Sequence, residues 1–441
     1  MKSIMRADVV VVGAGSAGSA AALLCARRGL SVLCLDRRPI EQAGARWVNG
    51  VPGWMFDWAG IGRPGVPELL SAGEPFHMFA GWGPERLVVR EHDVLEVDMR
   101  QLVSRLQGEG EAAGVRFLGE VQVYRFDGKW LHTSLGAIGA RFVVDASGLV
   151  GAGLLGRPGI EREHLCVAAQ EVRAIREPGA ARDYFASHKV PIGDTACFTG
   201  VEGGFSVLNL KVHAGTVSIL TGSIPALGHR SGRRMLDDFV REQPWVGERI
   251  FGGSLAIPLR RPFERIADGK VALLGDAACQ VFSAHGSGVG AGLVAARLLA
   301  DALATGKGTH GYALSWQRRW GGLLAAYDLF RRFSQTVSVD ELAAMFDHGF
   351  VDMATALEGL EQRMPGVDPA LIAGKLRAGM RNVAIAARLA PVVARMMLVR
   401  LLYRQFPARP ELVPKWSRQV RRLFGESEAD PVPNSRRAFG V

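Results

Sequence analysis

The stretch Val9-Val10-Val11-Val12-Gly13-Ala14-Gly15-Ser16-Ala17-Gly18 lies near the start of the chain and decides its fold. Four consecutive valines predict a buried strand, and the G-x-G-x-x-G pattern after them predicts a tight turn into a helix. Gly13 permits the turn, Gly15 lets a pyrophosphate approach the backbone, and Gly18 lets the helix pack closely on the strand. The amino terminus of that helix also offers unpaired N–H groups to an anion. This stretch therefore predicts a βαβ unit that binds a dinucleotide.

The residues that follow complete this unit. A helix is predicted over 19–28 and a second strand over 30–35, and Asp36 stands at the end of that strand. A carboxylate at this place accepts the ribose hydroxyl hydrogens of an adenosine and repels a 2′-phosphate, so we expect the site not to bind NADP. The alternative is an ordinary βαβ unit with a chance glycine pattern. All the features of the binding unit occur here in the required order, which favours the dinucleotide site.

A second glycine-rich segment lies far along the chain, at Gly275-Asp276-Ala277-Ala278 and Gly286-Ser287-Gly288-Val289-Gly290. Either segment alone is a weak nucleotide signal, but together they indicate a flavin held by both halves of one domain. A further G-x-G-x-x-G match at 151–156 is predicted to be a loop, because Arg157-Pro158-Gly159 breaks the chain where a helix would begin. The sequence therefore predicts one dinucleotide fold and no dedicated pyridine-nucleotide domain.

The composition excludes several classes of protein. The 441 residues, 48% hydrophobic and 22% charged, are typical of a soluble globular protein with two or three lobes. Neither a signal peptide nor a run of 18 apolar residues occurs, so we expect a cytoplasmic protein without a membrane span. The five scattered cysteines are predicted to be buried thiols, with neither a disulfide nor a metal site. The net charge of +10, without a nucleic-acid-binding motif, fits an acidic protein partner or a simple arginine bias.

The segments between the two glycine-rich stretches resemble one known superfamily. A helix is predicted after Asp98, a strand over 120–123, and a strand over 141–144 that ends in Asp145-Ala146-Ser147-Gly148. This series resembles the flavoprotein monooxygenase superfamily, which includes p-hydroxybenzoate hydroxylase, geranylgeranyl reductases and tryptophan halogenases. The resemblance implies an α/β fold: a glutathione-reductase-type FAD-binding domain with an inserted antiparallel-sheet substrate domain and a helical C-terminal region.

The resemblance also implies where FAD contacts the chain. Asp36 is expected at the ribose, the backbone of Val121 at the adenine, and Asp276 at the ribityl hydroxyls. The helix that begins near Gly288 is expected to point its N–H groups at the flavin ring, where they stabilise the reduced anion. For Asp276 a helix N-cap role is compatible with this one. The implied cofactor-binding residues are Gly13, Gly15, Ser16, Ala17, Gly18, Asp36, Arg37, Arg46, Arg100, Val121, Asp145, Gly148, Asp276, Gly286, Ser287, Gly288 and Val289.

Within the superfamily the local match is strongest with the tryptophan halogenases. The segment from Gly275 to Val289 follows their pattern, and so does Phe56-Asp57-Trp58-Ala59-Gly60-Ile61. Halogenases use a lysine in this early region, but no lysine lies between Lys2 and Lys129. The tryptophans and the proline of their W-x-W-x-I-P strand are also absent from the stretch that begins at Phe205. The resemblance therefore implies a halogenase relative that keeps the flavin scaffold and carries out a different reaction.

Aromatic residues gather in the segment 47–82, which the resemblance places against the flavin ring. They predict a substrate pocket, and the alternative is a small hydrophobic sub-core. The predicted pocket residues are Trp47, Asn49, Trp54, Phe56, Trp58 and Phe205. His285 stands in the loop that faces the flavin and is the candidate catalytic base, with an ordinary loop histidine as the alternative.

The chain is expected to divide into three parts. The boundaries are 1–46, 90–156 and 266–305 for a discontinuous FAD-binding domain, 47–89 and 157–265 for the substrate domain, and 306–441 for a helical C-terminal domain. The stretch 390–402 has arginines about every fifth residue and could lie on a membrane or in a protein groove. A helical bundle packed on the flavin domain is the favoured interpretation.

The hypothesis that follows is a single-component FAD monooxygenase. NADH or NADPH would reduce the flavin transiently, and oxygen would then be transferred to an aromatic small molecule or to a tryptophan in an acidic peptide or protein, as in the biogenesis of a quinone cofactor. One alternative is a flavin reductase of isoprenoid double bonds, which predicts a long apolar tunnel. Its relatives carry a cysteine after the second strand, and residues 37–60 contain none. The other alternative is a non-catalytic FAD-binding partner protein.

Overall fold

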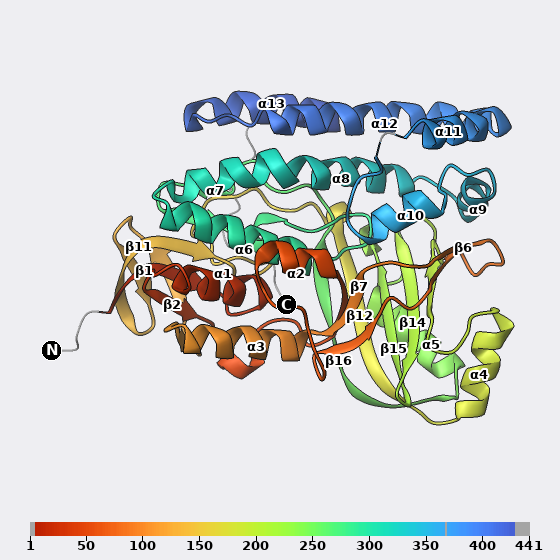
Figure 1. Cartoon of the computed structure of the whole chain (residues 1–441), viewed down its shortest axis with the longest axis horizontal. Helices are drawn as coiled ribbons and strands as arrows, with labels where there is room; N and C mark the ends of the chain where they lie inside the picture. Colours follow the sequence, from red (N-terminus) through yellow and green to blue (C-terminus); the bar gives the residue numbers. More distant parts are fainter. Residues whose placement is uncertain (1–4, 367, 428–441) are drawn as a thin grey trace.

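The computed structural model describes residues 5–366 and 368–427. Its first sheet is built around the valine strand, because consecutive β-branched residues suit a parallel sheet that is covered on both faces. The strands are β1 (Arg6–Val12), β2 (Val32–Leu35), β8 (Arg116–Leu118), β9 (Val123–Phe126), β10 (Trp130–Thr133), β11 (Gly136–Asp145), β17 (Ala267–Asp268) and β18 (Val271–Leu273). They run in the order β17-β18-β11-β1-β2-β8, and the β9–β10 pair joins the sheet through β11 (Figure 1). The residues after β1 and β2 therefore meet at one edge.

Three helices cover one face of this sheet: α1 (Ser16–Ala26), α3 (Met99–Ala112) and α6 (Val289–Ala304). Helix α1 contacts both α3 and α6 and lies between them. Because neighbours press on both sides of α1, its residues from Gly18 to Cys25 are all buried and mostly small. The second glycine-rich segment leads into α6. Because α6 packs beside α1, the turn before α6 lies close to the turn before α1.

A second sheet forms the substrate-side layer. Its strands are β5 (Phe76–Ala80), β6 (Arg86–Val89), β12 (Leu165–Ile175), β13 (Thr195–Thr199), β14 (Ser206–His213), β15 (Thr216–Ser223) and β16 (Val246–Pro258). Their order is β16-β12-β15-β14-β13-β5-β6, antiparallel except for the parallel pair of β13 and β5. Helix α5 (Gly232–Glu242) packs on β12 and β15, while α4 (Pro178–Ser187) lies at the end of the layer (Figure 1).

A small third sheet connects these layers. It consists of β3 (Val48–Pro52), β4 (Leu69–Ala72) and β7 (Val94–Asp98), in the order β3-β7-β4. Helix α2 (Gly53–Ala59) follows β3 and packs on α6. The expected boundary at residue 90 thus falls just before a strand that pairs with residues assigned to the other domain. The division into three domains stays a prediction.

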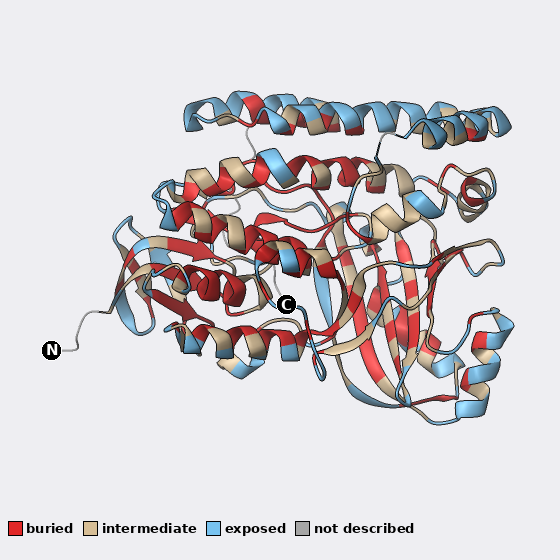
Figure 2. Ribbon diagram, in the orientation of Figure 1, coloured by how far each residue is buried: buried red, intermediate tan, exposed pale blue. Residues whose placement is uncertain are grey.

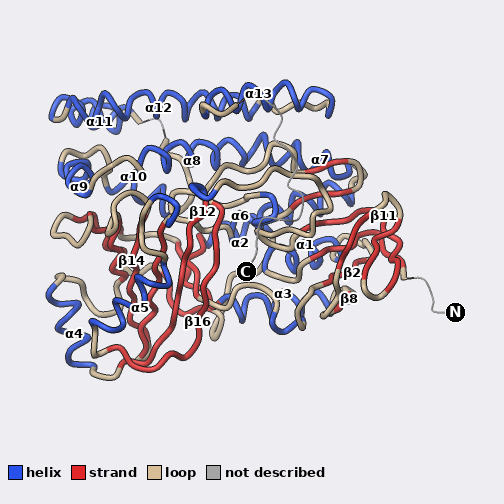
Figure 3. The backbone as a smooth tube through the Cα atoms, turned by 180° about the vertical axis from the view of Figure 1, so that it is seen from behind, coloured by secondary structure: helices blue, strands red, loops and turns tan. Residues whose placement is uncertain are grey.

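Helices dominate the chain after residue 305. They are α7 (Gly308–Trp316), a π-helical turn at Gln317–Gly321, α8 (Gly322–Ser334), α9 (Val339–Asp347), α10 (Met353–Leu360), α11 (Pro369–Arg381), α12 (Val383–Arg404) and α13 (Val413–Phe424). Val399 and Tyr403 are buried where α12 packs on α8. In Figures 1 and 3 the helices α11, α12 and α13 form an outermost layer beyond α7 and α8. Residues 428–441 of the expected C-terminal domain lie outside the described residues.

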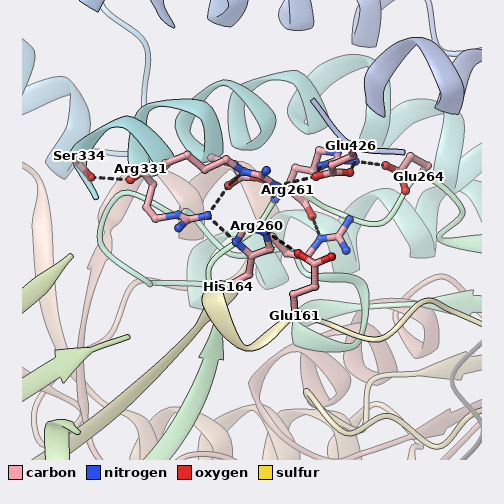
Figure 4. Close-up of polar contacts among 10 residues, drawn as sticks. Glu161, His164, Arg260, Arg261, Glu264, Arg331, Ser334 and Glu426 are labelled. Carbon is pink, nitrogen blue, oxygen red and sulfur yellow. Dashed lines mark hydrogen bonds and ion pairs between the residues drawn. The ribbon is translucent and has the colours of Figure 1, made fainter. Parts of the chain in front are cut away.

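An ionic cluster fastens the end of the described chain to the molecule (Figure 4). The guanidinium of Arg261 is buried and donates to Glu264 and Glu426, each at 2.7 Å. The backbone N–H of Arg261 donates to Asp328 of α8 at 2.9 Å. Desolvation alone would raise the pKa of Glu426, but the hydrogen bond and charge of Arg261 outweigh it and lower that pKa to about 2. Residue 426 is therefore held against the loop before β17.

The structure confirms the predicted α/β fold with its antiparallel insertion and helical C-terminal region. The expected strand over 120–123 is wrong. Glu120 has a φ of +58° and turns the chain, so that the N–H of Val121 donates to the carbonyl of Asp36 at 2.8 Å. The strand that pairs with β2 in parallel is β8, which ends at Leu118. The glycine pattern at 151–156 is a loop, as predicted.

Candidate active site

The first glycine-rich turn has the geometry of a dinucleotide site. Gly13 has a φ of +104°, and a Cβ atom there would lie 2.3 Å from the carbonyl oxygen of Ala146. A Cβ atom at Gly18 would lie 1.8 Å from the carbonyl oxygen of Gly13. Only glycine fits either position, so the turn stays tight and α1 starts close to the sheet. Ser16 and Ala17 form the first turn of α1, where N–H groups are free for an anion.

Asp36 stands next to this turn at the end of β2. Its carboxylate accepts from the backbone N–H groups of Ala14 and Arg38, both at 2.9 Å. The two oxygens keep further lone pairs, which a ribose could use. Val121 lies beside Asp36 through the backbone hydrogen bond described above. Asp36 and Val121, predicted from separate segments, are thus brought together.

Two of the predicted cations share a small cleft beside this turn. Arg46 and Arg100 line a cavity of about 320 Å³ together with Gln107, whose amide donates to the carbonyl of Ala14 at 3.2 Å. The guanidinium of Arg100 is occupied, because it donates to both oxygens of Asp98 and lies 3.4 Å from the ring centroid of Phe251. Arg46 is exposed and its guanidinium donates to the carbonyl of Glu41 at 3.3 Å, and Arg37 is exposed next to Asp36 in the sequence.

Asp145, at the end of β11, stabilises the loop that follows this strand. Its carboxylate accepts from the backbone and side chain of Ser147 and from the N–H of Ala152. Gly148 follows with a φ of +81°. Asp145 is buried, so this carboxylate shapes the loop, and the contact of Asp145 and Gly148 with FAD remains a prediction.

The second glycine-rich turn presents a carboxylate without a partner. Asp276 lies in the turn Gly275–Ala278, and none of the described residues donates a hydrogen bond to its side chain. A Cβ atom at Gly288 would lie 3.3 Å from its Oδ1, so the carboxylate faces the start of α6, where Gly288 precedes Val289. Desolvation raises the pKa of Asp276 to about 6. A polyol chain would supply the missing donors, and this acceptor therefore fits the ribityl part of FAD.

The loop before α6 forms a tight turn that closes on the small sheet. Phe282 and Ser287 pair as an isolated bridge, and the hydroxyl of Ser287 donates to the carbonyl of Gly50 at 3.4 Å. Gly286, inside the loop, has a φ of +79°. The ring of Phe282 packs on the rings of His285 and of Tyr327 in α8, with ring centroids 4.8 and 4.2 Å apart. The loop is thus clamped between β3 and the C-terminal helices.

A large apolar cavity opens from this loop. It measures about 1360 Å³ and extends between the second sheet and the helices α8 to α12. Trp47, Asn49, Phe205 and His285 line it, and their contact with a substrate stays a prediction. His285 is exposed to the inside of the cavity, and desolvation by the surrounding protein lowers its pKa to about 4. At neutral pH this imidazole is therefore uncharged.

Three of the predicted pocket residues lie elsewhere. Trp54 and Trp58 pack on Trp320 of the π-helical turn, with ring centroids 5.5 and 5.6 Å apart. Phe56 is fully buried in the core, because it lies on the side of α2 that packs on α6. The aromatic cluster is thus in large part the hydrophobic sub-core that the sequence left as an alternative.

The residues that sequence reasoning missed come from the C-terminal helices. Phe330 and Phe333 of α8, Phe346 of α9, and Met397 of α12 line the cavity. Apolar residues at helical spacing were visible in these segments. That spacing indicates a buried face but does not tell whether the face meets another helix or an open cavity.

The comparisons with known proteins agree with this geometry. Residues 8–64 match the model of the family described as FAD dependent oxidoreductase. A digeranylgeranylglycerophospholipid reductase of Methanopyrus kandleri is 30% identical over 67% of this chain and 80% of its own length. The chain belongs to this FAD-dependent reductase family. The corresponding protein of Sulfolobus acidocaldarius is 24% identical over 96% of this chain and 98% of its own length.

The solved structures show the same fold. A geranylgeranyl bacteriochlorophyll reductase-like protein of Thermoplasma acidophilum superposes with a TM-score of 0.68 at 16% identity, over 88% of this chain and 100% of that one. Flavin-dependent halogenases and monooxygenases are among further solved structures with this fold. The family match and the sequence relatives show that the chain is an FAD-dependent oxidoreductase. Sequence relatedness places it with the reductases, one of the families named by the resemblance.

Proposed function

We propose that this protein reduces carbon–carbon double bonds in the isoprenoid chain of a lipid, with FAD as its redox cofactor. The observation that carries the proposal is the continuous apolar cavity between the loop at His285 and the helices α8 to α12. Burial of apolar surface is worth about 0.8 kcal/mol per CH₂ group, so a long hydrocarbon chain gains more from such a cavity than a small ring does. The names of the sequence relatives supply the same substrate class.

The reaction divides the work between cofactor and protein. When bound, reduced FAD would supply a hydride to one carbon of the double bond, and a proton would add to the other carbon. The chain's own residues bind the hydrocarbon and hold the alkene against the loop from Phe282 to Ser287. His285, with a pKa of about 4, is neutral at pH 7, and a hydrogen bond to the backbone of Gly359 in α10 holds its ring. We assign the proton to water that reaches the polar side of the cavity. Asn209 and Lys211 of β14 line the cavity on that side.

Hydroxylation of an aromatic ring or of a peptidyl tryptophan is the less well supported function. Among the residues predicted for the aromatic pocket, Phe56 is buried in the core and Trp54 and Trp58 pack against it. The sequence relatives described above are named as reductases. No specific observation favours a non-catalytic partner protein. NADH or NADPH remains the proposed source of electrons for the flavin.

The experiment loads the full chain with FAD, reduces it without oxygen, and adds a geranylgeranyl lipid. Mass spectrometry is expected to show a gain of two hydrogen atoms for each double bond reduced, with bleached flavin returning to its oxidised spectrum. A matched reaction in air with tryptophan-containing peptides tests the other function. An added oxygen atom there, without any reduction of the lipid, would refute the proposal. Separate reduction by NADH and by NADPH identifies the electron donor.

A further inference from the structure

The outermost helix of the protein exposes an apolar face to solvent. Leu398 and Leu401 of α12 are 52% and 51% exposed. Together with Ala387 and Ala394 they recur at intervals of three, four and seven residues, which places them on one side of a helix. The opposite side, with Val399 and Tyr403, packs on α8. Figure 2 shows the layer of α11 to α13 exposed along its outer surface.

Helix α11 presents further exposed apolar residues at the cavity. Ile372, Leu376 and Met380 follow one another at intervals of four residues, and Leu376 is 65% exposed. These three residues also line the cavity, as do Val383 and Met397 of α12. These side chains line the cavity and are also exposed, so solvent reaches the part of the cavity wall that α11 and α12 form. An apolar surface of this kind is unfavourable in water unless something covers it.

Positive charge surrounds the exposed apolar face. The segment from Val383 to Ser427 contains nine arginines and lysines and two glutamates. Arg395 and Arg404 of α12 and Arg418 of α13 are exposed. An apolar helical face flanked by arginines is typical of helices that lie in the interface of a membrane, and each cation near an anionic bilayer adds about 1 kcal/mol. In the part of the chain that the structure describes, no helix is long and apolar enough to cross a membrane.

We propose that α11 and α12 dock on the surface of an anionic lipid bilayer, with the exposed part of the cavity wall facing the lipid. Leu398 and Leu401 insert among the acyl chains, and the surrounding arginines contact the headgroups. An isoprenoid tail then passes from the bilayer into the cavity without crossing water. This last step rests on the proposed function, whereas the docking itself does not.

Binding to vesicles tests the docking. The FAD-loaded full chain is sedimented with vesicles of phosphatidylcholine alone or of phosphatidylcholine mixed with phosphatidylglycerol. We expect binding to the mixed vesicles that weakens as salt rises, and a loss of about tenfold or more in Leu398→Glu/Leu401→Glu, since two charges would enter the acyl region. Ile250→Glu, at an exposed apolar residue of β16, is the matched control and should bind as the wild type does. Arg395→Gln/Arg404→Gln should bind more weakly and with a smaller dependence on salt.

The outcomes separate the possible occupants. Absence of wild-type binding to anionic vesicles, or unchanged binding of Leu398→Glu/Leu401→Glu, overturns the proposal. So does a stable dimer in light scattering that this double variant dissociates while vesicles remain unbound. The double variant should still reduce a detergent-dispersed prenyl substrate but lose activity on a lipid embedded in vesicles. If no prenyl substrate is reduced while the double variant alone fails to bind vesicles, the proposed function fails and the docking stands.

Discussion

The side-chain oxygen of Gln170 accepts a hydrogen bond of 2.6 Å from the backbone N–H of Val48, and this bond joins the second sheet to the small sheet near the loop from Phe282 to Ser287. The amide of Gln170 also donates to Ser218 at 3.1 Å. Both partners of the short bond are buried. Strand β3, which carries Val48 and Asn49, is thereby fixed relative to the strands that line the cavity.

Replacement of Gln170 by methionine should therefore destabilise the protein. The variant keeps the length of the side chain but leaves the Val48 N–H buried without an acceptor, which costs about 1–3 kcal/mol. We expect this loss in urea unfolding, together with a rise in KM for the lipid substrate. Gln122→Met, at an exposed position, is the control and should change stability by less than about 0.5 kcal/mol. Equal stability of the two variants would contradict the role given to this bond.

Asp276 should control the pH dependence of FAD binding. Its pKa is about 6 without a bound polyol, and donors from the ribityl hydroxyls would stabilise the carboxylate and lower that pKa. Binding then releases a proton, so affinity should rise as pH increases through 6. Fluorescence titration of the apoprotein at several pH values measures this. Asp276→Asn should bind FAD about tenfold more weakly at pH 8 and lose the dependence around pH 6. A wild-type slope that persists in the variant would exclude Asp276 as its source.

His164 should make the protein less stable in acid. Desolvation and the charge of Arg332 lower its pKa to about 4, and its Nδ1 accepts a hydrogen bond from Arg331 at 2.9 Å (Figure 4). Between pH 6.5 and 4 the unfolded state binds more protons than the folded state, so stability falls as pH drops through this window. The contribution is about 2–3 kcal/mol. The free energy of unfolding should differ less between pH 7 and pH 4.5 in His164→Gln than in His213→Gln. The second variant replaces an exposed histidine.

A larger residue at Val207 should shorten the accepted substrate. Val207 lies on the cavity side of β14, next in that row to Phe205 and Asn209. In Val207→Phe the added ring would occupy space that a long hydrocarbon chain fills, while a shorter chain would still fit. We expect kcat/KM for a geranylgeranyl lipid to fall at least tenfold and that for a geranyl analogue to change little. An equal loss of kcat/KM for both substrates would show that Val207 affects the chemistry or the fold and does not select substrates by chain length.

The sequence predicts the geometry of the glycine-rich turns better than the walls of the cavity. Gly13, Gly18 and Asp36 could be placed because their roles depend on backbone conformation and on a strand end a few residues away. Trp54 and Trp58 could not, because their partner Trp320 lies far along the chain. The cavity wall on α8 to α12 was equally hidden, since an apolar helical face looks the same in sequence whether it is packed or open.

The walls of the cavity come from stretches of chain that are separate in the gene: residues just after the first turn, strands of the inserted sheet, and the last helices. Changes in the length of α11 and α12 would therefore alter the walls of the cavity without touching the glycine-rich turns that are expected to hold FAD.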